Sequence, residues 1–124
     1  MLEEKMDAGG IVLQSRVELG KFDTVRSLQR KVYATEPSLI LKALKSLDQG
    51  VTPRKQDERF ASVYPEKRKP KDSKIDAKRP LVELFDSIRA CDPDAYPAFF
   101  EIEGEDVGIK IWRLNRPADE SDLV

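Results

Sequence analysis

Residues 51–79 follow neither a helical nor a strand period, and this break most restricts what the chain can fold into. The segment contains Pro53, Pro65 and Pro70 together with ten Lys or Arg residues. Proline lacks an amide hydrogen and disfavours helical backbone in the residue before it, so long packed elements are not expected here. We therefore predict an extended, solvated linker between two folded parts, residues 1–50 and 80–114.

The N-terminal part combines a strand pattern with helical patterns. Residues 11–19 contain a short apolar run followed by alternating apolar and charged residues, which predicts a strand or a pair of strands. Residues 24–34 keep helical spacing, and Asp23 is a suitable N-cap. Pro37 interrupts this pattern and can open a second helix, which Gly50 would stop. The pattern therefore predicts two consecutive helices.

The C-terminal part reads as a helix followed by a hairpin. Pro80 can stand at the first position of a helix that ends near Cys91. Residues 98–102 and 108–112 form two short strand patterns around a glycine-containing loop, which predicts a β-hairpin. The polar residues 115–124 are expected to form a flexible tail. The apolar stripe of the helix consists of Leu81, Leu84, Phe85 and Ile88.

The composition excludes several classes of function. The chain has no histidine, the commonest general base and metal ligand, which argues against a hydrolase triad and a metal site. Cys91 is the only cysteine, so no intramolecular disulfide can form, and a cytoplasmic location with a buried thiol is expected. No apolar run is long enough for a membrane helix, and the N-terminal residues do not resemble a signal peptide.

Charge is distributed unevenly along the chain. Residues 51–80 carry ten basic and five acidic residues, whereas residues 92–124 carry three basic and nine acidic ones. The basic residues Lys67, Arg68 and Lys69 could neutralise RNA phosphates. Because acidic residues are interspersed and aromatic residues are few, a solvated linker is favoured over an RNA-binding segment.

Three stretches, in order, resemble one family. They are Met6–Val12 followed by Gln14, Tyr64 followed by Asp72–Asp76, and Ile88–Pro93 leading into a strand. Together they resemble the formyltransferases that use formyl-tetrahydrofolate, a group that includes methionyl-tRNA and sugar N-formyltransferases. The resemblance extends over about residues 3–113, and the order and spacing of the motifs carry it.

The resemblance implies a catalytic role for Asp7. The family uses an Asn, a His and an Asp on a Rossmann-like domain, and Asp7 matches the Asp in its Asp-Ala-Gly turn. The Asn–His pair is then expected upstream of Met1. Ala8, Gly9 and Gly10 would face the formyl-tetrahydrofolate cofactor. From the residues alone, a simple turn is the favoured interpretation of Asp7 and the two glycines.

The expected fold class is an α+β fragment. It would comprise the end of a Rossmann-like α/β formyltransferase domain (1–50), a basic proline-containing linker (51–79), a helix-plus-hairpin module (80–114) and a flexible tail (115–124). Without the Asn–His pair, the 124 residues alone are expected to be inactive, although the parent protein would be an enzyme.

The acceptor suggested by the resemblance is the amine of a nucleotide-linked amino sugar. Residues 96–101 replace the Pro-Trp-Pro turn usual in the tRNA enzymes, and few strands follow. Methionyl-tRNA is the alternative substrate, with tRNA as the alternative partner. A third hypothesis is a non-catalytic interaction or dimerisation module. Because two strands cannot cover their own apolar faces, we expect a homodimer with Phe99 and Trp112 at its interface.

Overall fold

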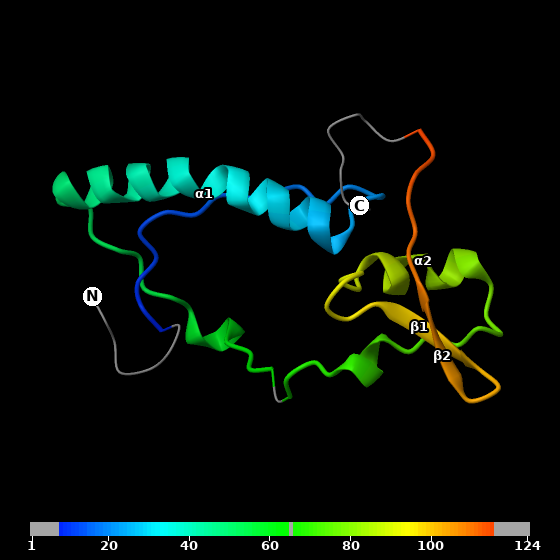
Figure 1. Cartoon of the computed structure of the whole chain (residues 1–124). Helices are drawn as coiled ribbons and strands as arrows, with labels where there is room; N and C mark the ends of the chain where they lie inside the picture. Colours follow the sequence, from blue (N-terminus) through cyan, green and yellow to red (C-terminus); the bar gives the residue numbers. More distant parts are fainter. Residues whose placement is uncertain (1–7, 65, 116–124) are drawn as a thin grey trace. The chain divides into compact units, whose positions relative to one another are not determined.

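The structure, a computed structural model, describes residues 8–64 and 66–115. These residues form a small α+β structure with two α-helices, two short 3-10 helices and one antiparallel two-stranded sheet (Figure 1). They divide into two compact units. Unit 1 comprises residues 8–18 and 31–64, and unit 2 comprises residues 19–30 and 66–115.

Helix α1 runs without interruption from Val25 to Asp48. The prediction of two helices was therefore wrong, because Pro37 lies inside α1. A proline removes one backbone hydrogen bond, and the hydroxyls of Thr35 and Ser38 donate to backbone carbonyls in the turns beside it. Neither hydroxyl replaces the bond that Pro37 removes, which would go to the Tyr33 carbonyl, so the helix continues through Pro37 at that cost because good helix formers stand on both sides.

The start of α1 is capped one residue later than predicted. The Thr24 hydroxyl accepts a hydrogen bond from the Ser27 amide at 3.3 Å, and the Ser27 hydroxyl accepts one from the Thr24 amide at 2.9 Å. Asp23 instead closes the preceding turn, because its carboxylate accepts from the Gly20 amide and from the Ser27 hydroxyl. The buried Asp23 thus holds the chain that enters the helix.

The strand predicted for residues 11–19 does not form. Ile11 makes an isolated antiparallel bridge with Arg54, and no strand occupies the rest of the segment. Leu13 and Leu19 are exposed. An alternating pattern becomes a strand only beside a partner strand, and the described residues offer this segment none beyond Arg54.

In unit 2, helix α2 (Leu81–Arg89) follows Pro80 and precedes the hairpin of β1 (Ala98–Ile102) and β2 (Glu105–Ile109). The strands pair in the register Ala98↔Ile109. Glu103 and Gly104 both have left-handed backbone, as a two-residue hairpin turn requires. The second strand therefore starts three residues earlier than predicted, and Trp112 lies beyond it.

The hydrophobic core lies entirely in unit 2. It consists of buried Leu84, Ile88, Cys91 and Ala98, with Ile75, Ile109 and Ile111 packed against them. The buried position predicted for Cys91 is confirmed. Leu81, placed in the apolar stripe by its spacing, is 72% exposed because the first turn of α2 extends past the core. Phe85 packs edge-on against Phe22, with ring centroids 6.1 Å apart.

The segment predicted as a solvated linker is partly packed. It contains the 3-10 helices Glu58–Phe60 and Pro70–Ser73, and Ser73 is buried. Lys74 bridges in parallel to Phe99, and the Ile75 amide donates to the Phe99 carbonyl at 2.8 Å. The prediction was therefore wrong for residues 73–75, which line the free edge of β1. A single hydrogen-bonded bridge leaves no periodic signature in a sequence.

The segment at Lys74 and Ile75 also bears on the predicted dimer interface. Phe99, proposed for that interface, is half-buried where this segment pairs with β1, whereas Trp112 is 60% exposed. The homodimer remains a prediction without support from the described residues. None of the helices in residues 8–64 and 66–115 is both long and apolar enough to cross a membrane.

Candidate functional site

The turn that carries the predicted site residues is held by a second segment of unit 1. Asp7 lies outside the described residues, whereas Ala8 and Gly9 are half-buried and Gly10 is exposed. The Gln56 side-chain amide donates to the Gly9 carbonyl at 2.8 Å. Ile11 and Arg54 exchange two backbone hydrogen bonds of 2.8 and 2.9 Å. Residues 53–56 therefore fix the backbone on the C-terminal side of Asp7.

Gly10 is required by packing. A Cβ atom at this position would lie 2.7 Å from the Cβ atom of Pro53, closer than side chains approach one another. Proline has a rigid ring and cannot move its Cβ without moving its backbone. Packing against Pro53 thus explains why a glycine stands at position 10. Close approach of a cofactor to Ala8, Gly9 and Gly10 stays a prediction.

No sequence pattern indicates that Arg54 and Gln56 hold this turn. Both lie in the predicted linker, yet they contact the Gly9–Ile11 backbone, and Arg54 also donates to the Gln14 side chain at 3.4 Å. Pro53 is the one signal that could have indicated the contact, because proline favours extended backbone beside another chain. Among residues 8–64 and 66–115 no cluster of three potential metal ligands occurs.

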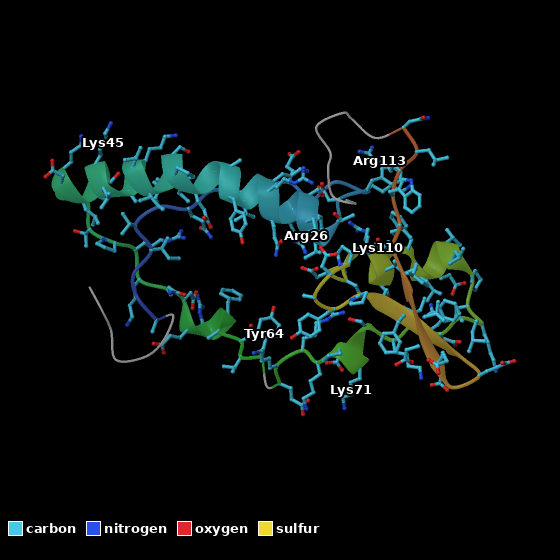
Figure 2. The ribbon with its side chains drawn as sticks, viewed as in Figure 1. Arg26, Lys45, Tyr64, Lys71, Lys110 and Arg113 are labelled. Atoms are coloured by element: carbon cyan, nitrogen blue, oxygen red, sulfur yellow. The ribbon has the colours of Figure 1, made fainter. Side chains whose placement is uncertain are left out.

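A second feature of interest is the basic segment of unit 2, residues 66–79, which are exposed apart from Ser73 and Ile75. Figure 2 labels one of its lysines, Lys71. Three of its cations are engaged: Arg68 by Ser73 and Cys91, Lys74 by Glu101, and Arg79 by Glu83. Among the described residues, the remaining lysines form no ion pair within 4 Å. They are Lys67, Lys69, Lys71 and Lys78.

Arg68 attaches the basic segment to the core of unit 2. Its guanidinium donates to the Ser73 hydroxyl at 3.1 Å and to the Cys91 sulfur at 3.2 Å. The Ser73 hydroxyl donates in turn to the Tyr96 carbonyl at 3.1 Å, and the thiol to the Ser87 carbonyl. These bonds satisfy the buried polar atoms, so Cys91 and Ser73 have structural partners.

Carboxylates after α2 connect this helix to α1. Arg26 contacts Asp92 at 3.0 Å and Asp94 at 2.8 Å, and Lys110 contacts Asp94 at 3.4 Å. The backbone amides of Ala95 and Asp94 donate to the Asp92 carboxylate and, with a smaller effect of Arg26, lower its pKa. Asp92 is thus an ionised turn residue with a structural role.

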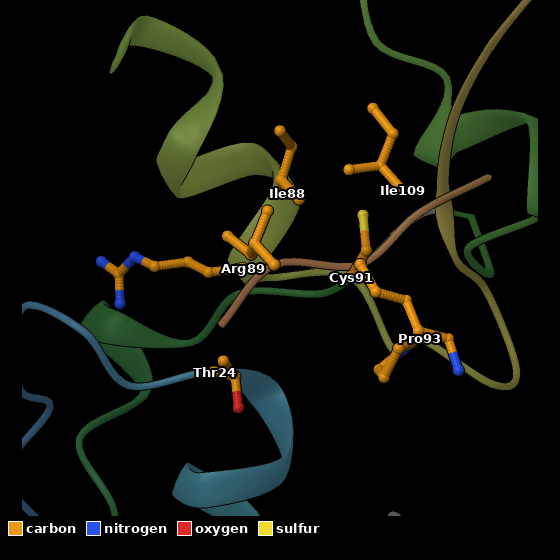
Figure 3. A pocket seen from close by; sticks show the side chains of 8 residues that line it. Thr24, Ile88, Arg89, Cys91, Pro93 and Ile109 are labelled. Atoms are coloured by element: carbon orange, nitrogen blue, oxygen red, sulfur yellow. The ribbon is translucent and has the colours of Figure 1, made fainter. Parts of the chain in front are cut away.

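The cavity in unit 2 is too small for a substrate. It measures about 20 Å³, room for one water molecule. Figure 3 shows Thr24, Ile88, Cys91 and Ile109 around it. Half of its lining residues are core side chains described above: Ile88, Cys91, Ile109 and Ile111. Of the two regions, the turn in unit 1 is therefore the stronger candidate for chemistry, and the basic segment for binding.

Comparison with known proteins gives clear relatives. A methionyl-tRNA formyltransferase from Natranaerobius thermophilus is 36% identical over 112 residues, which cover 88% of this chain and 34% of the relative. Proteins of the same name from Symbiobacterium thermophilum and Fusobacterium nucleatum are 31% and 32% identical over 92% of this chain, covering 34% and 36% of their own lengths. No family model matches the chain. The chain thus spans about a third of the length of these relatives.

Proposed function

Because this chain belongs to the formyltransferase family, as its motifs indicated, we propose that it is part of an enzyme that formylates methionyl-tRNA. The observation that carries the proposal is the similarity to three methionyl-tRNA formyltransferases over about nine-tenths of the chain. The names of these relatives favour methionyl-tRNA as the substrate over the amino sugar, for which no comparison gives support. Formyl-tetrahydrofolate is the proposed formyl donor.

We assign the chain to the C-terminal portion of this enzyme. In this assignment residues 1–50 end the Rossmann-like catalytic domain, and residues 80–114 begin a C-terminal module. Residues 51–79 connect the two. The order of the motifs supports this division. The two compact units divide the described residues differently, because residues 19–30 belong to unit 2 and residues 51–64 to unit 1. The packed residues 73–75 belong with the C-terminal module, because they border β1.

Asp7 has the proposed catalytic role. In formyl transfer the methionyl amine attacks the formyl carbon and loses a proton, while the bond from that carbon to the tetrahydrofolate nitrogen breaks and the leaving nitrogen takes up a proton. The oxyanion that forms in between needs hydrogen-bond donors. The carboxylate of Asp7 would orient and charge-balance the histidine expected upstream of Met1. Residues 53–56 hold the backbone after Asp7, which would keep that carboxylate in place.

Four lysines of the basic segment, which form no ion pair with a described residue, are the proposed contacts to the tRNA backbone. Lysine ammonium groups neutralise phosphates and release counterions, so such contacts strengthen binding without reading sequence. Lys67, Lys69, Lys71 and Lys78 are exposed and face no carboxylate within 4 Å among the described residues.

A two-substrate assay tests the proposed function. The complete enzyme would be incubated with formyl-tetrahydrofolate and either methionyl-tRNA or a nucleotide-linked amino sugar, and released tetrahydrofolate would be measured. We expect turnover only when methionyl-tRNA is the acceptor. Turnover only with the amino sugar would favour the amino-sugar hypothesis instead, and turnover with neither acceptor would contradict the proposal that the enzyme is a formyltransferase. An Asn-x-His motif encoded about 30–40 residues before Asp7, a spacing estimated from the family resemblance, would agree with the catalytic assignment.

A further inference from the structure

The two most exposed aromatic side chains of the described residues lie close together in the sequence. Phe60 is 82% exposed and Tyr64, labelled in Figure 2, is 94% exposed. Val63 beside Tyr64 is 89% exposed, and Ala61 and Ser62 between the rings are exposed as well. Aromatic rings are usually buried at least in part, because they carry much of the apolar surface of a chain. We call residues 60–64 the aromatic stretch.

Local hydrogen bonds hold Phe60 in its exposed position. Asp57 caps the 3-10 helix Glu58–Phe60, since its carboxylate accepts from the Arg59 amide at 3.1 Å and pairs with the Arg59 guanidinium at 2.7 Å. The Phe60 amide donates to the Asp57 carbonyl at 3.1 Å. The Arg59 guanidinium lies over the Phe60 ring, 5.9 Å from its centroid. Phe60 therefore stands on a capped turn, with most of its ring still open to solvent.

The chain that follows the aromatic stretch is rich in cations. Residues 66–79 carry seven Lys or Arg and three Asp or Glu, and four of the lysines form no ion pair with a described residue. Lys67 follows Tyr64 by three positions, which an extended chain spans in at most ~11 Å. Exposed aromatic rings next to cations are typical of proteins that bind single-stranded nucleic acid, because bases stack on the rings while the cations neutralise phosphates.

A protein partner is a poorer occupant of the aromatic stretch. A stable protein interface buries ~800 Å² on each partner, whereas this stretch offers three large side chains separated by the small Ala61 and Ser62. A nucleobase needs only one ring to stack on. The size of the stretch and the charge beside it therefore both favour an unpaired base.

We propose that the aromatic stretch stacks unpaired bases of methionyl-tRNA, with Tyr64 as the main platform. The inference rests on the proposed function for the identity of the RNA. Lysine contacts act on the phosphates of paired and unpaired RNA alike, whereas an aromatic ring stacks only on a base that is not enclosed in a duplex. The aromatic stretch thus adds a preference for single-stranded RNA that the lysines do not have.

RNA binding to the complete enzyme tests this preference. Fluorescence anisotropy would give the Kd for a labelled single-stranded RNA of about 12 nucleotides, for a duplex RNA with the same number of phosphates, and for methionyl-tRNA. Tyr64→Leu keeps an apolar side chain but removes the ring, and Tyr64→Phe retains the ring. The matched control is Tyr33→Leu on α1 in unit 1, where Tyr33 is 61% exposed. Thermal melting of each variant shows whether folding is affected.

We expect Tyr64→Leu to raise the Kd for single-stranded RNA by about tenfold, the effect of losing one stacked base, and to weaken methionyl-tRNA binding as well. Its Kd for duplex RNA should be unchanged. The dependence of log Kd on log salt should also be unchanged, because stacking releases no phosphate counterions. Tyr64→Phe and Tyr33→Leu should bind all three RNAs as the unsubstituted enzyme does.

Three results would overturn the proposal. They are unchanged binding of single-stranded RNA by Tyr64→Leu, an equal loss toward single-stranded and duplex RNA, and unchanged binding of methionyl-tRNA. A lower melting temperature with unchanged RNA binding would assign the Tyr64 ring to packing within the enzyme and also overturn it. If the expected loss toward single-stranded RNA and methionyl-tRNA is found in an enzyme that fails to formylate methionyl-tRNA, only the proposed function is contradicted.

Discussion

Unit 2 is the larger of the two units, and the units also differ in what holds them together. Unit 2 buries four apolar residues between α2 and β1 and joins its segments through Arg26, Arg68 and Arg89. Unit 1 has no fully buried residue among those described, and its contacts are one β-bridge, a few side-chain hydrogen bonds and one partly covered helix side.

The difference shows that one short chain can contain both a self-supporting part and a dependent part. Unit 2 pairs a helix with a hairpin, the smallest arrangement that covers one face of two strands. Unit 1 presents a long helix and an extended turn with no sheet between them. Hydrophobic burial is the main driving force of folding, so unit 2 should fold by itself and unit 1 should need more of the enzyme.

The largest expected effect concerns Asp7 in the complete enzyme. Asp7→Asn should lower kcat by about a thousandfold or more with little change in the KM for formyl-tetrahydrofolate, since a carboxylate that orients a catalytic histidine acts mainly in the transition state. Steady-state kinetics measure this split. Asp57→Asn, which removes an exposed carboxylate paired with Arg59, is the control and should leave kcat unchanged. Near-normal turnover of Asp7→Asn would reduce Asp7 to a turn residue.

The 124-residue chain alone should show no formyl transfer at all. It lacks histidine, and the proposed site needs groups from outside the chain. Incubation with formyl-tetrahydrofolate and methionyl-tRNA should release no tetrahydrofolate above the background without protein. Robust turnover by the chain alone would contradict both the assignment of Asp7 and the dependence of unit 1 on other parts of the enzyme.

The contrast between the two units should also appear in stability. In the 124-residue chain, Leu84→Ala removes a 3% exposed core side chain and should lower the free energy of unfolding by about 2–5 kcal/mol. Leu44→Ala removes a 57% exposed side chain and should cost less than about 0.5 kcal/mol. Urea denaturation followed by circular dichroism compares the two variants. A comparable loss for both would mean that unit 1 has a core of its own.

A substitution at Gly10 tests its tight contact with Pro53 in unit 1. Gly10→Ala places a methyl group against the Pro53 ring and should cost about 1–3 kcal/mol by forcing the Ile11–Arg54 bridge apart. Amide hydrogen exchange at Ile11 and Arg54 measures that opening. The double variant Gly10→Ala with Pro53→Gly should recover part of the protection. Unchanged exchange in the single variant would show that the turn is not packed on Pro53.

The smallest expected effect concerns Asp92 in unit 2. Because its folded-state pKa is lowered, its contribution to stability is present above the ordinary Asp pKa of about 4 and is lost as the pH falls through the lower folded-state value. Asp92→Ala should lower the free energy of unfolding by about 1–2 kcal/mol at pH 7 and by less near pH 2. Denaturation at several pH values checks this, and an equal loss at both extremes would contradict the role of the ionised carboxylate.

The sequence alone determined those elements whose signals are local. The stripe of Leu84 and Ile88 indicated α2, and the glycine between two strand patterns indicated the hairpin. The order of the motifs also identified the formyltransferase family. Helical periodicity and turn residues can be read within a few residues of chain, and family motifs from their order along it, so none of them needs knowledge of what lies nearby in space.

The tertiary structure decided which patterns find a partner. The alternation of residues 11–19 gives no strand because only Arg54 pairs with it, whereas Lys74 and Ile75, without any pattern, border β1. The hydrogen bond from Gln56 to Gly9 and the contact between Gly10 and Pro53 join residues more than forty positions apart. Strand pairing and close packing depend on such distant neighbours, and the apolar spacing of Leu44 alone does not reveal whether its partner lies in this chain or outside it.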